Sequence, residues 1–146
     1  MNRSDLQNLV EAQRAFFRTG KTLSPAFRRR QLCRLKAALS EREPELLLAL
    51  KADLNKSAFE AYTTELGIVR EELNTAIRQV EKWSAPHRVP LSVVHFPATG
   101  WVQPEPYGVA LIMSPWNYPL QLTLNPLIAA IAARNCAVVK ASAYAP

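Results

Sequence analysis

One asparagine stands in a short turn whose residue types could stabilise negative charge. Asn117 lies at the centre of the run Pro115-Trp116-Asn117-Tyr118-Pro119, directly after the apolar residues 109–113. In open α/β sheets, ligands bind just beyond the carboxyl ends of strands. An amide held there can donate a hydrogen bond to an oxygen that gains negative charge during a reaction. Asparagine also suits turns for conformational reasons alone, so the residue type by itself leaves a purely structural role open.

The segments around this turn predict a βαβ unit. Residues 109–113 are a continuous apolar run, which is typical of a strand covered on both faces. A helix is predicted to begin at Pro119 and to end near Arg134, with a restart at Asn125-Pro126. The apolar residues 137–139 form the next predicted strand. The second strand should lie parallel to the first, through a right-handed crossover.

The first 90 residues predict a series of amphipathic helices. The first covers residues 5–18 and ends at Gly20, and a second begins with Ser24 as N-cap and Pro25 as its first residue. The run Ser40-Glu41-Arg42-Glu43 resembles a capping box and predicts a third helix that ends at residue 54. A further capping box at residues 57–60 predicts a helix of about 25 residues, which contains Gly67.

The segment that follows predicts a β-ribbon. Residues 84–90 indicate a linker, and two short strands are predicted around residues 93–96 and 101–102, on either side of the turn 97–100. Because such a ribbon rarely stands alone, we expect it to pair with another sheet in this chain or in another chain. The sequence thus divides into a helical region (1–90), a ribbon suited to oligomerisation (91–107) and the beginning of an α/β sheet (108–146).

Composition and charge exclude several classes of function. The net charge is +6, and all but two of the 18 Lys and Arg residues precede residue 91. The densest basic cluster, Arg28-Arg29-Arg30 with Arg34, is on a predicted helix, so its members point in different directions. A nucleic-acid surface should instead form a one-sided stripe. Residues 120–133 are too short and too polar to cross a bilayer, and the first residues lack the apolar core of a signal peptide.

The cysteines and histidines predict no metal site and no disulfide framework. The chain has two cysteines, Cys33 and Cys136, which are far apart in the sequence. Each is interpreted as a small apolar filler. His87 and His95 have no partners at metal-ligand spacing and are interpreted as structural. Free cysteines are typical of a reducing compartment, which favours a cytoplasmic protein.

Several motifs in a fixed order resemble one family. The sequence resembles the N-terminal part of an aldehyde dehydrogenase, of the class 3 type that includes fatty-aldehyde enzymes. The helical lead, residues 51–56 and Tyr62, has the same likeness. The most specific segments are, in order, Glu105-Pro106-Tyr107-Gly108-Val109, Pro115-Trp116-Asn117-Tyr118-Pro119, Ala129-Ala130-Ile131-Ala132-Ala133 and Val138-Val139-Lys140.

The resemblance implies an α/β fold in which the βαβ unit begins a Rossmann-like parallel sheet. It also implies NAD- or NADP-dependent oxidation of an aldehyde to a carboxylic acid through a cysteine thiohemiacetal, by a full-length homodimer. Asn117 would donate its amide to the oxyanion. Tyr118 would face the aldehyde, and Tyr62 could reach the substrate entrance. The residues implied at the cofactor are Met113, Ser114, Pro115, Trp116, Lys140, Ser142 and Ala143.

The sequence departs from the family pattern in two ways. The family run Lys-Pro-Ser-Glu reads Lys140-Ala141-Ser142-Ala143 here, so the acid that would bind the ribose hydroxyls is replaced by Ala143. Because a 2′-phosphate is repelled by such an acid, NADP stays open beside NAD. The nucleophile and general base implied by the resemblance lie downstream, and neither Cys33 nor Cys136 can replace them.

Three functional hypotheses follow. The favoured one is that the chain is the N-terminal portion of an aldehyde dehydrogenase and is inactive by itself. The second is a non-catalytic remnant that pairs with a complete subunit through the ribbon at 93–103. The third, which the charge distribution disfavours, is a basic helical nucleic-acid-binding module.

Overall fold

The computed structural model describes residues 2–145, and helices make up most of it. Met1 and Pro146, the outer limits of two of the predicted regions, lie outside the described residues. The α-helices are α1 (Arg3–Arg18), α2 (Pro25–Glu41), α3 (Glu43–Leu54), α4 (Ala58–Ala61), α5 (Gly67–Gln79) and α6 (Pro119–Ala132). The strands are β1 (His87–Val89), β2 (Gly100–Val102), β3 (Val109–Met113) and β4 (Cys136–Lys140). Short 3-10 turns cover Lys21–Leu23, Val93–His95 and Lys82–Ser84, and a π-helical turn covers Tyr62–Leu66.

Local signals at the start of the chain predict the first two helices correctly. Gly20, with φ of 72°, adopts the left-handed conformation that follows α1. The Ser24 hydroxyl accepts a hydrogen bond from the Phe27 amide at 3.3 Å, and Pro25 occupies the first turn of α2. Such caps act within one helical turn, which is why the sequence alone reveals them.

The prediction of a capping box at Ser40 is wrong. Helix α2 continues through Ser40 to Glu41, and α3 begins at Glu43 with Arg42 at its N-cap. The Ser40 hydroxyl accepts a hydrogen bond from the Arg70 guanidinium of α5, at 3.3 Å. This tertiary contact engages the hydroxyl that would otherwise cap α3.

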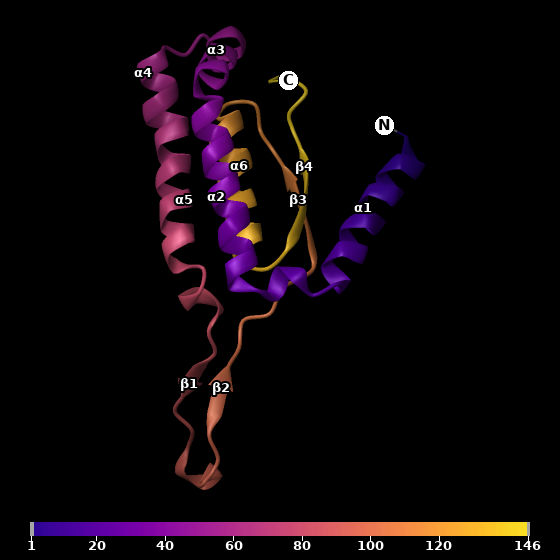
Figure 1. Ribbon diagram of the computed structural model, residues 1–146, viewed down its shortest axis with the longest axis vertical. Helices are drawn as coiled ribbons and strands as arrows, with labels where there is room; N and C mark the ends of the chain where they lie inside the picture. Colours follow the sequence, from indigo (N-terminus) through magenta and orange to yellow (C-terminus); the bar gives the residue numbers. More distant parts are fainter. Residues whose placement is uncertain (1, 146) are drawn as a thin grey trace.

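The core lies between α2, α5 and α6, which run side by side (Figure 1). Its buried members come from all three helices, and partly buried side chains of α3 pack at its edge. They are Leu32, Leu39, Val69, Leu73, Ala76, Val80, Ile128 and Ala132. The long helix predicted after residues 57–60 therefore buries apolar side chains from Leu66 to Val80. It contains a π-helical turn between α4 and α5.

Strands β3 and β4 are parallel neighbours, as predicted for a βαβ unit. The register pairs Val109 with Cys136 and Met113 with Lys140. Helix α6 connects the two strands and runs through Pro126 without a break, so the predicted restart is wrong. Burial of Ile128, Ala130 and Ala132 offsets the hydrogen bond that proline removes.

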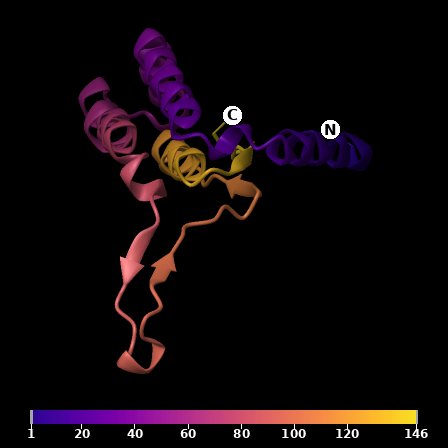
Figure 2. The same ribbon diagram turned by 60° about the horizontal axis from the view of Figure 1, so that its bottom comes forward.

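The expectation that β3 is covered on both faces is also wrong for this chain. Ile112 is buried beneath α6, whereas Leu111 is 64% exposed and Met113 is 70% exposed. Helix α1 contacts β4 and β3 on the side away from α2 and α5 (Figure 2). Phe17 of α1 lies near Val109 and Ala110 at the beginning of β3. The composition of β3 is that of a strand covered on both faces, because it is apolar throughout. One of these apolar faces is exposed within residues 2–145.

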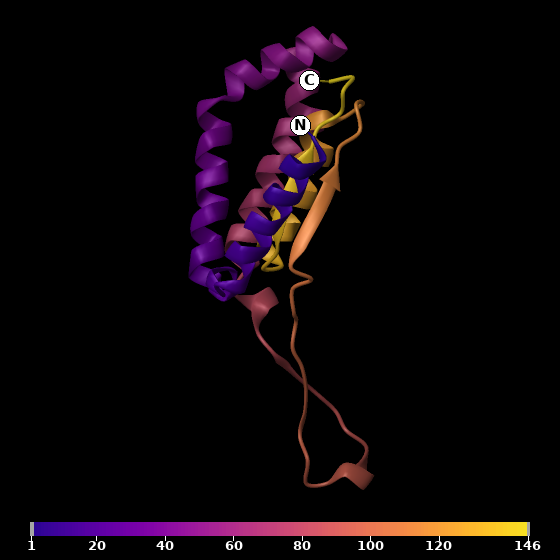
Figure 3. The ribbon, with the colours of Figure 1, turned by 90° about the vertical axis from the view of Figure 1, so that its right-hand side faces the viewer.

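Strands β1 and β2 form an antiparallel hairpin that projects away from the helices (Figure 3). The register pairs His87 with Val102 and Val89 with Gly100, so β1 lies inside the segment predicted as a linker. Residues 93–95 form a 3-10 turn instead of the predicted strand. Pro90 and Pro97 cannot donate ladder hydrogen bonds, and the ladder is confined to the base of the hairpin.

Candidate active site at the carboxyl end of β3 and β4

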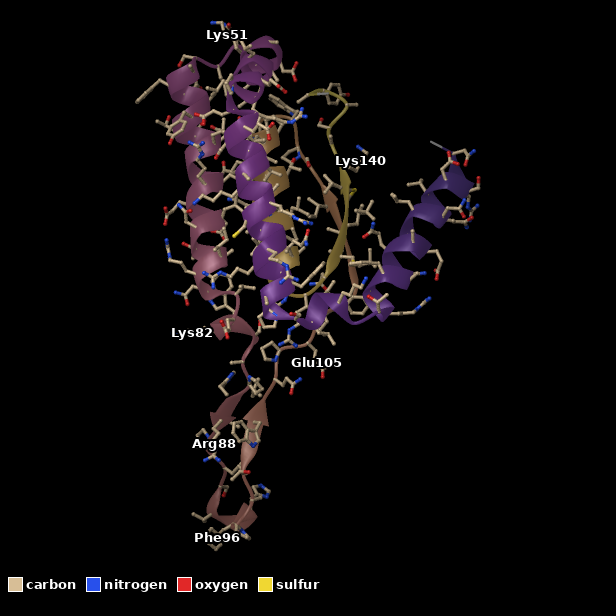
Figure 4. The ribbon with its side chains drawn as sticks, viewed as in Figure 1. Lys51, Lys82, Arg88, Phe96, Glu105 and Lys140 are labelled. Carbon is tan, nitrogen blue, oxygen red and sulfur yellow. The ribbon has the colours of Figure 1, made fainter. Side chains whose placement is uncertain are left out.

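The two parallel strands end beside each other, and the turn that contains Asn117 begins there. The Ser114 amide donates a hydrogen bond to the Lys140 carbonyl at 3.0 Å, which extends the ladder by one residue. Figure 4 shows Lys140 near the end of β4, far from Phe96 at the tip of the hairpin. The fold therefore brings together the residues predicted at the cofactor from the two strands: Met113, Ser114 and Lys140.

The turn exposes its side chains while its backbone is anchored. Asn117 is exposed, and Trp116 is 56% exposed. Thr123, in the first turns of α6, is hydrogen-bonded through its hydroxyl to Ser114 Oγ at 2.5 Å and to the Pro119 carbonyl. The Asn117 amide is thus available at the surface of a turn that is anchored to both the strand and the helix.

A buried carboxylate caps the helix that follows the turn. Glu65 has no exposed side-chain surface, and its Oε2 accepts hydrogen bonds from the Leu120 amide at 2.8 Å and the Gln121 amide at 3.2 Å. These are amides of the first turn of α6, whose N-cap residue, Tyr118, makes no side-chain capping bond. A negative charge at this end also interacts favourably with the helix dipole.

A buried lysine holds the carbonyl of Asn117 itself. Lys56 Nζ lies 2.5 Å from Glu65 Oε1 and donates to the Asn117 carbonyl at 3.1 Å. The same nitrogen lies 4.0 Å from the centroid of the Tyr118 ring. Three partners match the three N–H bonds of an ammonium group. The side chain of Lys56 is only 8% exposed, so these contacts are shielded from water.

The π-helical turn explains how Glu65 reaches this position. A turn that is one residue wider than an α-helix turns Glu65 and Leu66 inward together, next to Ala61. Hydroxyl groups satisfy the carbonyls of the preceding turn: Thr64 donates to Glu60 at 2.7 Å, and Thr63 donates to Phe59 at 2.8 Å. Such π-turns are frequent at functional sites.

Lys56 and Glu65 are site residues that the sequence reasoning missed. One signal was present: Glu65 is a charged residue inside an otherwise apolar stripe that includes Leu66 and Val69. A charge at a core position calls for a buried partner. The partner backbone, however, is more than 50 residues away along the chain, so the pattern alone could not identify it.

The two tyrosines predicted at the substrate, Tyr118 and Tyr62, lie in different surroundings. Tyr118 is beside Lys56 and is 39% exposed, at the turn itself. Tyr62 is the first residue of the π-helical turn. Its ring centroid is 5.8 Å from the guanidinium carbon of Arg70. The Tyr62 side chain is 39% exposed, so it does not belong to the apolar core.

The segment after β4 presents few polar groups. Within residues 2–145, Lys140 Nζ donates one hydrogen bond, to the adjacent Ala141 carbonyl at 3.3 Å, so the ammonium is available to a ligand. Ser142 Oγ accepts from the Tyr144 amide at 3.1 Å, and Ala143 is exposed. Residues 140–145 contain no Asp or Glu, and an exposed lysine in such a segment suits an anionic or hydroxyl-rich ligand.

The two cysteines differ from each other. Cys136 is buried at the start of β4, and burial raises the pKa of its thiol. Cys33 is exposed on α2, so its interpretation as an apolar filler is wrong. Neither lies at the carboxyl end of the strands. Within residues 2–145 no group of three His, Cys, Asp or Glu side chains is arranged to hold a metal ion.

Comparison with known proteins assigns the chain to a family. The family model described as Aldehyde dehydrogenase family matches residues 1–146. The chain belongs to the aldehyde dehydrogenase family. It is 39% identical over 143 residues to the 4,4'-diaponeurosporen-aldehyde dehydrogenase of Staphylococcus aureus. The matched region is 95% of this chain and 31% of that protein. It is 42% identical over 137 residues to aldehyde dehydrogenase family 3 member B1 of Bos taurus, covering 94% of this chain and 28% of that protein.

Solved aldehyde dehydrogenase structures share the fold. The substrate-bound Staphylococcus aureus AldH superposes with a TM-score of 0.92 at 39% identity, over 97% of this chain and 31% of that chain. The P. syringae indole-3-acetaldehyde dehydrogenase AldA, as a mutant in complex with NAD+, superposes with a TM-score of 0.83 at 26% identity, over 98% and 28% of the two chains. The resemblance to the N-terminal part of a class 3 enzyme and the α/β fold are thereby confirmed. The chain spans about 30% of the length of the curated relatives it matches.

Proposed function

We propose that this chain forms the N-terminal part of an NAD(P)-dependent aldehyde dehydrogenase, in which Asn117 stabilises the oxyanion. The observation that carries the proposal is the exposed Asn117 side chain on a turn whose backbone is anchored by buried groups. When a cysteine thiolate adds to the aldehyde carbon, the carbonyl oxygen takes up the electron pair of the C=O bond. An amide donor held in place costs no reorganisation at that moment.

The same end of the sheet suits a nicotinamide dinucleotide, which accepts hydride from the aldehyde carbon when bound. The side chains present fit such a group: Lys140 has no ion-pair partner within residues 2–145, and Met113 and Trp116 offer exposed apolar surface. We assign Ser114, Pro115 and Ser142 to the walls of this groove. Lys140 would meet the ribose hydroxyls or a 2′-phosphate. Ala143 stands where an acid would disfavour NADP, so both NAD and NADP stay open as the cofactor.

We assign the aldehyde-facing role to Tyr118 and the substrate entrance to Tyr62. Two observations support the assignment of Tyr118: it is next to Asn117, and its exposed ring lies against Lys56 Nζ. Tyr62 is supported by its exposure alone.

The free thiols favour a reducing, cytoplasmic location. No helix within residues 2–145 is long and apolar enough to cross a membrane.

The experiment is an assay of reduced nicotinamide formation with NAD+ and NADP+ and a series of aldehydes. The full-length enzyme that contains this chain should reduce NAD+ or NADP+ in an aldehyde-dependent manner. The isolated 146-residue chain should reduce neither, because the resemblance places the nucleophile and base downstream. Turnover by the isolated chain, or no turnover by the full-length enzyme, would contradict the proposal.

We further propose that the hairpin of β1 and β2 joins two subunits as a homodimer. Its side chains Val93, Val94 and Phe96 are almost fully exposed, which is unusual for apolar residues unless another surface covers them. The double variant Val94→Asp/Phe96→Asp should convert the full-length protein from dimer to monomer in sedimentation analysis. The matched control is His95→Asp, which adds a charge at the same tip without removing apolar surface. Retention of the dimer by the double variant would contradict an interface role for the hairpin.

A further inference from the structure

The most buried ion pair of residues 2–145 joins a loop to the π-helical turn and contacts the Asn117 turn. Lys56 follows Asn55, whose φ of 52° ends α3 and redirects the chain inward. The side chains of Lys56 and Glu65 are 8% and 0% exposed, whereas the other ion pairs of the described residues are at least one quarter exposed. This pair therefore has a different environment from the surface pairs.

The pair makes four contacts with one short segment of backbone and its aromatic neighbour. Glu65 accepts from the amides of Leu120 and Gln121, and Lys56 donates to the carbonyl of Asn117. Lys56 also lies under the Tyr118 ring. Together these contacts fix the peptide units on the C-terminal side of Asn117, from its own carbonyl to the first turn of α6.

Fixing that carbonyl restrains the backbone from which the Asn117 side chain departs. The chain is held at the strand end before Asn117 and at the Asn117 carbonyl after it, so φ and ψ of Asn117 cannot change without straining one of these contacts. This restraint limits the movement of the Asn117 Cβ. Displacement of a reacting or stabilising group by about 1 Å can cost about a hundredfold in rate. A hydrogen bond to one carbonyl can thus influence turnover without touching substrate.

Stability alone does not require charged residues here. A buried ion pair must be desolvated, and an apolar pair of similar volume is often equally stabilising. Backbone groups at the start of α6 need an acceptor, but Glu65 alone supplies it. The lysine adds a directed donor at the Asn117 carbonyl, which an apolar side chain could not supply.

We propose that Lys56 and Glu65 are positioning residues that hold the Asn117 amide in the direction required for the oxyanion. This inference rests on the proposed function and extends it to two residues that do not contact substrate. Lys56 acts through the Asn117 carbonyl, and Glu65 acts by orienting the ammonium group and by capping α6.

A double-mutant cycle on turnover in the full-length enzyme tests the proposal. Lys56→Met should lower kcat roughly 10-fold to 100-fold, whereas the matched control Lys51→Met, on the exposed surface of α3, should leave kcat unchanged. In the Asn117→Ala background, Lys56→Met should cause little further loss, because the amide that it positions is gone. Losses that multiply in the double variant would overturn the proposal and would indicate a separate structural role.

A charge-removing variant separates positioning from folding. Lys56→Met/Glu65→Gln removes both buried charges and keeps an acceptor for the α6 amides, so it should fold even if Lys56→Met alone does not. Its kcat should stay low, and recovery to the wild-type kcat would overturn the proposal. Glu60→Gln, at an exposed position on α4, is the matched control for the second substitution.

Hydrogen–deuterium exchange of the peptide covering residues 114–121 supplies a readout that is independent of catalysis. Lys56→Met should accelerate exchange in this peptide and leave the peptides of the hairpin unchanged. Unchanged exchange would overturn the structural part of the inference. If instead the exchange responds but the wild-type enzyme oxidises no aldehyde, the proposed function fails while the anchoring of the turn stands. The two failures are therefore distinguishable.

Discussion

The two ends of α6 are held by buried charges of opposite sign. At its N-terminal end, the Glu65 carboxylate accepts hydrogen bonds from the amides of Leu120 and Gln121. At its C-terminal end, the Arg28 guanidinium donates to the Ala132 carbonyl. Both charges come from the helices that precede the hairpin. Both match the helix dipole, which favours an anion at the N-terminus and a cation at the C-terminus.

The two ends differ in what remains exposed. Arg28 also donates to Ser84 Oγ at 2.8 Å, and Arg134 donates to the carbonyls of Ser84 and Pro104 at 2.6 and 3.0 Å. These cations are occupied by structural partners. At the other end the buried pair holds backbone groups and contacts the Tyr118 ring, and the Asn117 side chain remains exposed. The same arrangement thus stabilises the fold at one end and presents a donor at the other.

The largest expected effect on stability is at the C-terminal end. Arg28→Met should lower the free energy of unfolding by about 3 kcal/mol, because the Ala132 carbonyl and the Ser84 hydroxyl lose a charged donor inside the protein. Denaturant unfolding of the full-length enzyme measures this loss, with Arg29→Met, exposed on the same helix, as control. Turnover per folded molecule should not change. A loss of turnover without a loss of stability would remove the distinction between the two ends.

A smaller effect is expected at Arg134, whose backbone and side chain act in opposite directions. Its φ of 70° costs roughly 1–2 kcal/mol for a residue with a Cβ. Its two side-chain hydrogen bonds contribute about 1–3 kcal/mol in total. Arg134→Ala should destabilise the enzyme by the second amount, and Arg134→Gly should destabilise it by about 1 kcal/mol less. Equal unfolding midpoints for the two variants would show that the positive φ carries no cost.

The smallest effect concerns the two thiols. Burial raises the pKa of the Cys136 thiol, so a smaller fraction of it is thiolate at neutral pH than for an ordinary cysteine. Labelling of Cys136 should therefore need a more alkaline solution. Cys33, which is exposed, should label readily at mild pH. Labelling of the single variants Cys33→Ser and Cys136→Ser compares them directly. Rapid labelling of Cys136 would show that the start of β4 is open.

The sequence predicted the elements that depend on neighbouring residues. The cap at Ser24, the left-handed Gly20 and the βαβ order of 109–139 all follow from local pattern and are confirmed. The position of Asn117 beyond a strand end is confirmed as well, since it depends only on that order.

Features that depend on distant contacts could not be predicted. Ser40 was misread because its partner, Arg70, lies on another helix. The break predicted at Asn125-Pro126 is absent because burial of α6 outweighs the proline. The Lys56–Glu65 pair was missed because it contacts the backbone of the Asn117 turn, which lies near the pair only in the folded chain. The roles assigned to the predicted site residues remain proposals.

The most direct test of the account is the turnover of Asn117→Ala in the full-length enzyme. Loss of one oxyanion donor typically lowers kcat by about 10²–10³, and this is the result predicted, with folding unchanged by circular dichroism. Asn8→Ala, at an exposed position on α1, should retain full turnover. Wild-type turnover by a folded Asn117→Ala enzyme would contradict the account and would leave Asn117 as a turn residue only.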